Sequence, residues 1–323
     1  MTARVLVTGG AGFIGTHLTR TLLGHGHEVT VLDNFTAGSR DNVAAFAANK
    51  KFRLVEGDCL DPAALGKALD GVQHVYHLAA NPEVRIGEQA PQIHFEQNVV
   101  ATQRVLEAMR ERGVKDLVFT STSTVYGIVH RMPTPEDYGP MLPISIYGAS
   151  KLAAEAVISS YAATFGMRAL VFRLANVVGP RSTHGVAFDF VRKLKANPRS
   201  LEVLGDGSQT KSYVHVEDTV NGMVLAATKQ FGGSRDRFCD VYNLGSDDKI
   251  AVSDIVRLIV AEMNLDPPPE IKHTPKALHG GGWVGDVPTM LLDSSRLKGL
   301  GWRSTRGSRD ALRDTIRSML DAR

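Results

Sequence analysis

The stretch "RVLVTGGAGFIGTHLTRTLLGHGHEVTVLD" (residues 4–33) decides the fold, because its pattern predicts a strand, a turn, a helix and a second strand in succession. Gly9, Gly12 and Gly15 lie where the first strand passes into the helix. Glycine permits a tight turn there, and the N–H groups at the helix start attract a pyrophosphate. A plain βαβ turn is the alternative, but an acid at the end of the second strand, Asp33, favours a dinucleotide site.

Asp33 also indicates which dinucleotide binds. Its carboxylate is expected to accept hydrogen bonds from the adenosine ribose and to repel a 2′-phosphate, which favours NAD over NADP. Arg40 could serve a 2′-phosphate, although a solvated loop charge is the simpler interpretation. Asp58 ends the third expected strand, where it either contacts the adenine amine or caps the strand. The sequence therefore predicts NAD as the cofactor.

Strand and helix patterns alternate through the first half of the chain. Apolar, β-branched runs predict further strands at 52–58, 74–80, 116–122 and 169–177, and the segment 98–113 between two of them predicts a helix. Such alternation predicts a parallel sheet covered by helices on both faces. We therefore expect an α/β fold with a Rossmann-like, doubly wound parallel sheet.

The pattern changes after about residue 178. Expected there are helices at 186–196, from Asp218 onward and at 253–265, a strand at 240–245, and irregular segments at 266–270 and 278–286. We predict two parts. The dinucleotide-binding domain comprises residues 1–177, with 218–245 returning to it, and residues 178–217 and 246–323 form a smaller C-terminal α/β substrate lobe. Open α/β sheets bind ligands at the carboxyl edge that this lobe would cover.

Composition excludes several classes of function. The 323 residues include 37 Lys and Arg against 34 Asp and Glu, and the net charge of +3 is spread along the chain, so we expect no nucleic-acid partner. No apolar run has the length that spans a bilayer. Cys59 and Cys239 match no metal spacing, so we expect two buried free thiols and no metal. These features predict a cytoplasmic protein without a membrane partner.

A tyrosine and a lysine one helical turn apart give the second site signal. Tyr147 and Lys151, in "SIYGASKLAAEA" (145–156), face the same way on a helix. The strand before them ends in the hydroxyl-rich "TSTSTVYG" (120–127) at the same edge of the sheet. A nearby ammonium and a positively charged nicotinamide are expected to lower the pKa of the phenol from about 10 by roughly three units. The motifs therefore predict a proton-transfer site, and a surface helix pair is the alternative.

Together, "TGGAGFIG", "LAA" (78–80), "STSTVYG", "YGASK" and "RLANVVGP" resemble the extended short-chain dehydrogenase/reductases over nearly the whole chain. Within them, the chain is most similar to NAD-dependent nucleotide-sugar epimerases of the UDP-glucose 4-epimerase type. The resemblance implies removal and return of a hydride at C4 of a UDP-sugar through a 4-keto intermediate. UDP-glucose and UDP-galactose are the favoured substrates. UDP-glucuronate, a UDP-N-acetylhexosamine, another dehydrogenase or reductase reaction and a non-enzymatic NAD sensor are the alternatives.

Two residues favour epimerisation within this superfamily. Ser123 and Thr124 stand where the 4,6-dehydratases have an Asp-Glu pair, and where the decarboxylases have a glutamate. Neither hydroxyl can supply a carboxylate for extra proton transfer. A site that only reverses its own first step needs no further acid or base.

The resemblance also assigns residues to roles. Tyr147 is the expected catalytic base, Lys151 its partner and Thr122 the hydrogen-bonding group on the sugar. The expected cofactor-binding residues are Gly9, Gly12, Phe13, Ile14, Gly15, Asp33, Asn34, Asp58, Cys59, Leu78, Ala79, Ala80, Asn98, Tyr147 and Lys151. The expected substrate-binding residues are Thr122, Ser123, Asn176, Lys211 and Trp283. Lys211 and Trp283 stand where the family has phosphate-binding arginines, so these two positions depart from its pattern.

Some candidates have simpler alternative interpretations. Lys272, His273, Lys276, His279 and His184 are possible phosphate contacts or solvated loop residues. Arg85 could pair with a sugar C6 carboxylate, although an ion pair with Glu83 or Glu88 is favoured. Helices at 98–112 and 150–164 carry apolar stripes, which by resemblance imply a homodimer through a four-helix bundle, or else packing on the sheet alone.

Overall fold

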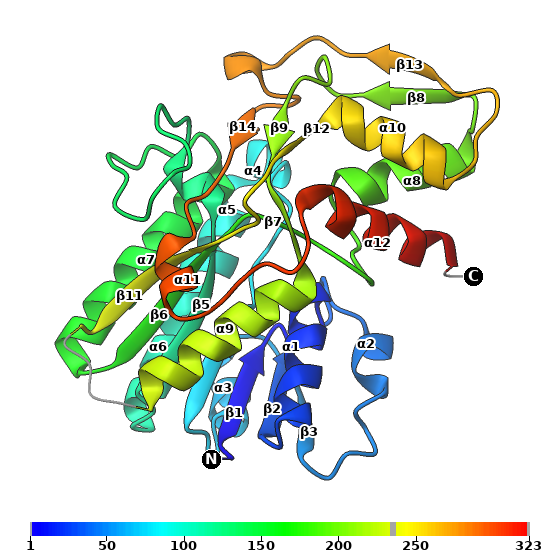
Figure 1. Ribbon diagram of the computed structural model, residues 1–323. Helices are drawn as coiled ribbons and strands as arrows, with labels where there is room; N and C mark the ends of the chain where they lie inside the picture. Colours follow the sequence, from blue (N-terminus) through cyan, green and yellow to red (C-terminus); the bar gives the residue numbers. More distant parts are fainter. Residues whose placement is uncertain (1, 233–236, 322–323) are drawn as a thin grey trace.

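A seven-stranded parallel sheet forms the centre of the computed structural model, which describes residues 2–232 and 237–321 (Figure 1). Its strands are β1 (Arg4–Thr8), β2 (Glu28–Asp33), β3 (Phe52–Glu56), β4 (His74–His77), β5 (Asp116–Thr122), β6 (Arg168–Leu174) and β11 (Cys239–Leu244). They lie side by side in the order β11-β6-β5-β4-β1-β2-β3. This is the strand order of a doubly wound Rossmann sheet with one added edge strand, so the predicted fold class is confirmed.

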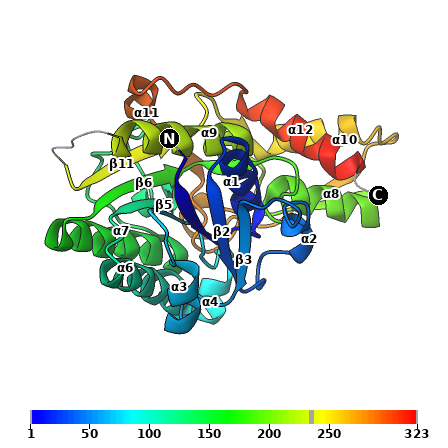
Figure 2. The ribbon, with the colours of Figure 1, turned by 90° about the horizontal axis from the view of Figure 1, so that it is seen from below.

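Helices cover both faces of the sheet (Figure 2). One face carries α1 (Phe13–Gly24), α9 (Val216–Phe231) and the short α11 (Ser295–Gly299); the other carries α3 (Pro62–Ala68), α6 (Ala101–Glu111) and α7 (Ile146–Phe165). Successive residues of a strand point to opposite faces. Val5 and Val7 therefore pack in the core under α1 and α9, while Leu6 packs in the core under α3 and α6. Both faces are buried, which explains the continuous apolar runs.

Two predicted elements differ from the structure. The helix expected at 98–113 begins earlier: α5 (Pro91–His94), a π-helical turn η1 (Phe95–Val100) and α6 follow one another without a break. The strand expected at 169–177 is two strands, because after Ala175 the chain leaves the sheet as β7 (Asn176–Val178) and pairs with β10 (Tyr213–His215). The remaining differences are shifts of element ends by a few residues.

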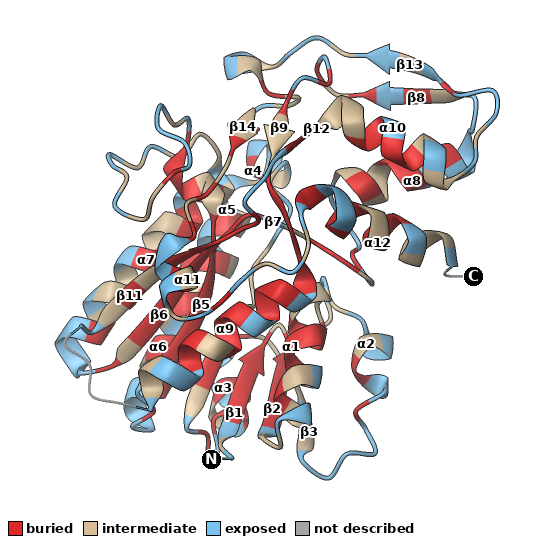
Figure 3. Ribbon diagram, in the orientation of Figure 1, coloured by how far each residue is buried: buried red, intermediate tan, exposed pale blue. Residues whose placement is uncertain are grey.

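A smaller group of elements lies beyond the carboxyl edge of the sheet (Figures 1 and 3). Its strands are β8 (Ser200–Val203) with β13 (Glu270–His273), and β9 (Thr210–Lys211) between β12 (Ile250–Ala251) and β14 (Thr289–Met290). Its helices α8 (Val186–Ala196), α10 (Val252–Glu262) and α12 (Ser308–Asp321) share one apolar core with β8. The shorter elements of the chain are α2 (Arg40–Ala44), α4 (Ile86–Gln89), η2 (Ser123–Tyr126) and η3 (Leu278–Gly280).

The division into two domains stays a prediction, and residues 233–236 of the expected return segment 218–245 lie outside the described part of the chain. Among the described residues, no helix is both long and apolar enough to cross a membrane. Cys59 is buried and forms no disulfide, and Cys239 is only half-buried at the start of β11.

Candidate active site

The glycine-rich turn joins β1 to α1 at the carboxyl edge of the sheet. Gly9 has φ of +69°, and a Cβ there would lie 2.8 Å from the backbone nitrogen of Ala79. A Cβ on Gly15 would lie 2.2 Å from the carbonyl oxygen of Gly9. The turn therefore packs directly against the predicted Leu78–Ala80 segment, which only glycine permits. α1 follows Gly12 without a side-chain cap, so the N–H groups of Phe13 and the residues after it can bind an anion.

The predicted acid lies beside this turn. Asp33 Oδ2 accepts a 2.9 Å hydrogen bond from Ala11 N, and Oδ1 accepts one of 2.8 Å from Phe35 N. Burial raises the pKa of the Asp33 carboxyl, and these two N–H groups oppose that shift. The acid therefore fixes the shape of the turn in addition to presenting a carboxylate at the end of β2.

Three further predicted residues lie near Asp33, at the ends of β2 and β3. Asn34 Nδ2 donates to Asp58 Oδ2 at 2.7 Å, which links the ends of β2 and β3. Cys59 is buried, and burial raises the pKa of its thiol to about 12.

Arg40 forms an ion pair with Glu56 and lies 4.4 Å from the centre of the Phe35 ring. This engagement agrees with the interpretation of Arg40 as a loop charge.

Tyr147 and Lys151 project from the first two turns of α7. Ser145 caps this helix, and its hydroxyl accepts a 3.0 Å hydrogen bond from Gly148 N. Lys151 is 3% exposed; its Nζ donates to the carbonyl oxygen of Thr120 at 2.7 Å and lies 4.4 Å from the centre of the Phe119 ring. The structure thus brings the lysine beneath the hydroxyl-rich end of β5, where Thr122 interacts with the Tyr147 phenol.

Burial shifts the pKa values of both members of this pair toward their neutral forms. Burial raises the pKa of the half-buried Tyr147 to about 12, and the hydrogen bond with Thr122 acts in the opposite direction. Burial lowers the pKa of Lys151 to about 7, and the charge of Glu155 opposes that shift. The lowering of the phenol pKa expected from the ammonium together with a charged nicotinamide stays a prediction for the NAD-bound protein. A buried phenol favours its neutral form.

The π-helical turn holds the start of α7. Asn98 lies in this turn; its Nδ2 donates to Ser150 Oγ at 2.9 Å, and Ser150 Oγ donates to the carbonyl oxygen of Tyr147 at 2.8 Å. Asn98 Oδ1 accepts from Asn81 N at 2.8 Å. The ring of the fully buried His94 meets the Tyr147 ring edge-on, with 5.7 Å between centroids. π turns often occur at functional sites. His94 and Ser150 were not predicted from the sequence, because they have no distinctive spacing.

A buried ion pair below Lys151 was also missed. Glu155 on α7 and Arg173 on β6 are 7% and 4% exposed, with 2.7 Å between Glu155 Oε2 and Arg173 Nη2. Two features of the sequence could have revealed it. Arg173 interrupts the apolar run of β6, and Glu155 lies at the i+4 position from Lys151.

Lys211 and Trp283, which stand where the family has arginines, lie in one cluster within the smaller group of elements. Lys211 Nζ is paired with the buried Asp286 and lies 5.1 Å from the centre of the Trp283 ring. Asp286 Oδ2 also accepts a 2.8 Å hydrogen bond from Gly282 N. Trp283 Nε1 is buried and has no hydrogen-bond partner among the described residues. The Lys211 charge is thus balanced by a carboxylate, and the Trp283 N–H is the donor of this cluster that lacks a partner among the described residues.

This cluster is close to the Tyr147 turn. A Cβ on Gly285 would lie 3.0 Å from Ser145 Cβ, two residues before Tyr147. Asn176 Nδ2 donates to the carbonyl oxygen of Ser212, the residue after Lys211, at 3.3 Å. Two groups of predicted residues, around Tyr147 and around Lys211, therefore border the same edge of the sheet.

The remaining candidates are ion-paired or exposed. Arg85 Nε is 3.1 Å from Glu83 Oε1, which is the pair that the sequence favoured. Lys276 pairs with Asp206 at 2.8 Å and Lys272 with Glu270 at 3.5 Å. The other three candidates are exposed: His184, His273 and His279.

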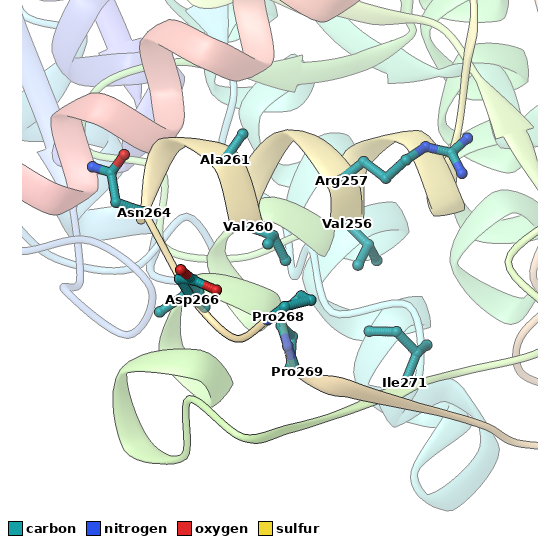
Figure 4. Close-up of a pocket in the computed structure, with 10 residues that line it drawn as sticks. Val256, Arg257, Val260, Ala261, Asn264, Asp266, Pro268, Pro269 and Ile271 are labelled. Atoms are coloured by element: carbon teal, nitrogen blue, oxygen red, sulfur yellow. The ribbon is translucent and has the colours of Figure 1, made fainter.

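A groove of about 530 Å³ lies elsewhere, along α10 (Figure 4). Val256 and Val260 line it from the helix, and Pro268, Pro269 and Ile271 line it from the following segment. None of the predicted site residues is among its lining residues, so it is separate from the candidate site.

Comparisons with known proteins agree with this geometry. The model of the NAD dependent epimerase/dehydratase family matches residues 5–245. UDP-glucose 4-epimerase of Corynebacterium glutamicum is 33% identical over 314 residues, covering 93% of this chain and 90% of the relative. A crystal structure of UDP-galactose 4-epimerase is 41% identical, with a TM-score of 0.86 and 98% of each chain covered. The Thermus thermophilus UDP-glucose 4-epimerase complex with NAD is 32% identical, with a TM-score of 0.85, covering 99% of this chain and 100% of the other.

Proteins named for other reactions are also similar. UDP-glucuronic acid decarboxylase 1 of Arabidopsis thaliana is 32% identical over 280 residues, covering 84% of this chain and 60% of the relative. The relatives thus share a fold and an NAD-dependent family but differ in the reaction after which they are named.

Proposed function

The chain belongs to the NAD dependent epimerase/dehydratase family, and on that premise we propose that it is a nucleotide-sugar 4-epimerase with UDP-glucose and UDP-galactose as its substrate pair. The family also confirms the resemblance to the extended short-chain dehydrogenase/reductases and the prediction of NAD as cofactor. One observation carries the choice of reaction. Ser123 and Thr124, which follow Thr122, bring hydroxyls and no carboxylate to the end of β5. Dehydration or decarboxylation needs an additional acid or base that these two side chains cannot supply.

The residues of the glycine-rich turn fit the cofactor. A Cβ on Gly9 or Gly15 would collide with neighbouring backbone, and α1 begins without a side-chain cap on its first N–H groups. These N–H groups would bind the pyrophosphate, and Asp33 would bind the adenosine ribose. When bound, NAD supplies the acceptor and donor of the hydride at C4 and a positive charge on its nicotinamide ring.

The chain's own residues would transfer the proton of the sugar hydroxyl. Tyr147 Oη would take the proton of the C4 hydroxyl and return it after the 4-keto sugar has turned its other face. Thr122 would hydrogen-bond the same hydroxyl and hold it against the phenol. Lys151, one helical turn from Tyr147, would supply positive charge beside the phenol. The raised pKa of Tyr147 means that added positive charge is required before the phenol can act as a base near neutrality.

The smaller lobe would hold the nucleotide diphosphate. Lys211 and the unpartnered N–H of Trp283 are the donors proposed for the phosphate oxygens, with Asn176 beside them. A lysine keeps the positive charge but lacks the two-pronged geometry of an arginine. With the domain limits predicted from the sequence, the larger domain would bind NAD and the smaller lobe the sugar nucleotide.

A panel assay tests the proposal. The purified holoenzyme is incubated with UDP-glucose, UDP-galactose, UDP-N-acetylglucosamine and UDP-glucuronate without added NAD, and the sugars are followed by NMR. The C4 epimer of UDP-glucose or UDP-galactose without accumulation of NADH is the expected result. Net NADH, a pentose or a 6-deoxy-4-keto sugar would instead identify a dehydrogenase, a decarboxylase or a dehydratase.

We also propose a cytoplasmic homodimer that uses α6 and α7. These helices pack against each other on one face of the sheet; Phe165 at the end of α7 and Phe95 in the π turn before α6 are 38% and 60% exposed. Burial of such surface between two copies is favourable. Sedimentation equilibrium tests it: a monomer at micromolar concentration contradicts the proposed dimer.

A further inference from the structure

A chain of buried polar side chains runs from the floor of the candidate site across the sheet. Its members come from different elements and all have exposed fractions of at most 7%: Ser121, Tyr126, Glu155, Arg173 and Asn243. A buried charge is costly unless it is paired and hydrogen-bonded. The hydrogen-bond partners of these five side chains therefore decide whether the buried charges among them are stabilised.

Glu155 is held from two sides. Ser121 Oγ, at the end of β5, donates to Glu155 Oε1. Arg173 on β6 donates from Nη2 to Oε2 at 2.7 Å and from Nε to both oxygens at 3.1 and 3.2 Å. Such donors stabilise the ionised form of a carboxylate. Glu155 is thus a fixed negative charge one helical turn after Lys151.

Arg173 is itself anchored on its far side. Its Nη1 donates to Tyr126 Oη and to the carbonyl oxygen of Glu136, each at 3.0 Å. Tyr126 Oη donates to Asn243 Oδ1 at 2.7 Å. Asn243 Nδ2 donates to the carbonyl oxygen of Thr134 at 2.8 Å. The Arg173 guanidinium is therefore hydrogen-bonded on both sides, and these bonds hold it in place beside Glu155.

Lys151 has few other charged neighbours. On its own helix it faces Tyr147 and Glu155, and β5 contributes the Phe119 ring and the Thr120 carbonyl. His77 on β4 is a further neighbour; burial, with the Lys151 charge adding to it, lowers the pKa of this histidine to about 3, so it is neutral. Arg173 on β6 is paired with Glu155. Glu155 is therefore the anionic side chain that counteracts the burial of the amine.

We propose that Glu155 is a positioning residue for the reaction, which keeps the Lys151 amine charged and bound to Thr120 by a fixed negative charge one helical turn away. This rests on the proposed function, because it assigns a task to the lysine of that site. A salt bridge that only stabilises the fold is the competing explanation. The two differ in their effect on the titration of Lys151.

The titration of Lys151 can be measured without turnover. Protein labelled with 13C at the lysine Cε is titrated by NMR, and the Lys151 signal is assigned by its absence from Lys151→Met. In Glu155→Gln we expect the midpoint to fall by about one to three pH units, because an opposite charge is lost. Glu155→Gln combined with Arg173→Met replaces the pair by uncharged groups and keeps a foldable core; the midpoint is expected to fall there as well.

Tyr126→Phe is the matched control. It removes the hydroxyl that Arg173 contacts but leaves Glu155 and its bond to Ser121 in place. A loss of stability with an unmoved Lys151 midpoint is expected. An unmoved midpoint in both Glu155 variants, or an equal movement in Tyr126→Phe, would overturn the proposal.

The reaction itself gives a second readout. In the Glu155→Gln holoenzyme the alkaline limb of the kcat profile should move to lower pH by the same amount as the NMR midpoint. A wild-type holoenzyme without turnover on any nucleotide sugar would count against the proposed function alone, since the NMR midpoints still decide the role of Glu155.

Discussion

The ε-amino group of Lys151 donates its hydrogen bond to the carbonyl oxygen of Thr120 at 2.7 Å, and so it lies under the end of β5. The phenol of Tyr147, one turn earlier on α7, interacts with Thr122 instead. The two side chains thus share a helix face without sharing a hydrogen bond of their own. This arrangement separates the task of holding charge from the task of moving the proton, and variants can test each.

Tyr147→Phe removes the proposed base. We expect turnover to fall by about 10²- to 10⁴-fold, which is the contribution typical of a positioned acid–base group. The amount of NAD that copurifies should not change, because the glycine turn and Asp33 are untouched. Tyr161→Phe is the control on the same helix, where the hydroxyl donates to Glu107 at 3.2 Å and accepts from Gln103 Nε2 at 3.0 Å. Equal turnover in Tyr147→Phe and the control would rule out the phenol as the base.

Lys211→Arg should strengthen nucleotide binding. An arginine keeps the ion pair with Asp286 and adds donors in a fork that fits a diphosphate. One more charge-assisted hydrogen bond contributes about 1.5 kcal/mol, so the Kd for UDP is expected to fall roughly tenfold in calorimetry. Lys276→Arg, whose lysine pairs with Asp206 in the same lobe, should leave the Kd unchanged. An unchanged Kd in Lys211→Arg would show that this position does not contact the diphosphate.

Gly15→Ala tests the glycine turn. The added Cβ would lie 2.2 Å from the Gly9 carbonyl oxygen and 2.7 Å from Gly10 Cα, so the turn must shift. We expect a loss of about 1–3 kcal/mol of stability and most of the bound NAD. Gly24→Ala is the control in the same helix; nothing lies within 4 Å of its Cβ, and it should stabilise by up to about 1 kcal/mol. Full NAD content in Gly15→Ala would contradict the proposed cradle.

His77 should make the protein sensitive to acid. It is fully buried between Thr8 and Thr102, and burial lowers its pKa from 6.5 to about 3. Between pH 6.5 and about 3, the unfolded chain therefore binds a proton at His77 that the folded chain does not bind. Stability from this group is complete above pH 6.5 and is lost as the pH falls, by about 1.4 kcal/mol per pH unit, until the pH reaches the folded value.

Urea unfolding at several pH values measures this effect. His77→Gln should lose stability less steeply than the wild type between pH 6 and 4, by about 1.4 kcal/mol per pH unit. His279→Gln, at an exposed loop position, should follow the wild type. Parallel curves for His77→Gln and the wild type would show that this histidine is protonated in the folded state.

The sequence predicted the sheet because most of its strands are buried on both faces and are therefore nearly continuous apolar runs. The edge strand β3, which has no buried residue, is the exception. Burial on both faces also hid the break after Ala175, since the apolar pattern continues from β6 into β7. The π turn was missed because Phe95–Val100 contains no glycine or proline that would mark an irregular turn. Glu155 was missed because a lone glutamate in a helix usually faces solvent. Its arginine partner comes from another part of the chain, and the raised pKa of Tyr147 likewise depends on burial that no local pattern reports.

The edge strand β11 has a consequence for synthesis on the ribosome. It pairs with β6 but follows it by a long stretch of chain, which includes α8 and α9. Until residue 244 has emerged, the nascent chain presents β6 as an open, apolar margin, and such margins recruit other strands. Nascent chains arrested before β11 should therefore aggregate more readily than chains that include it.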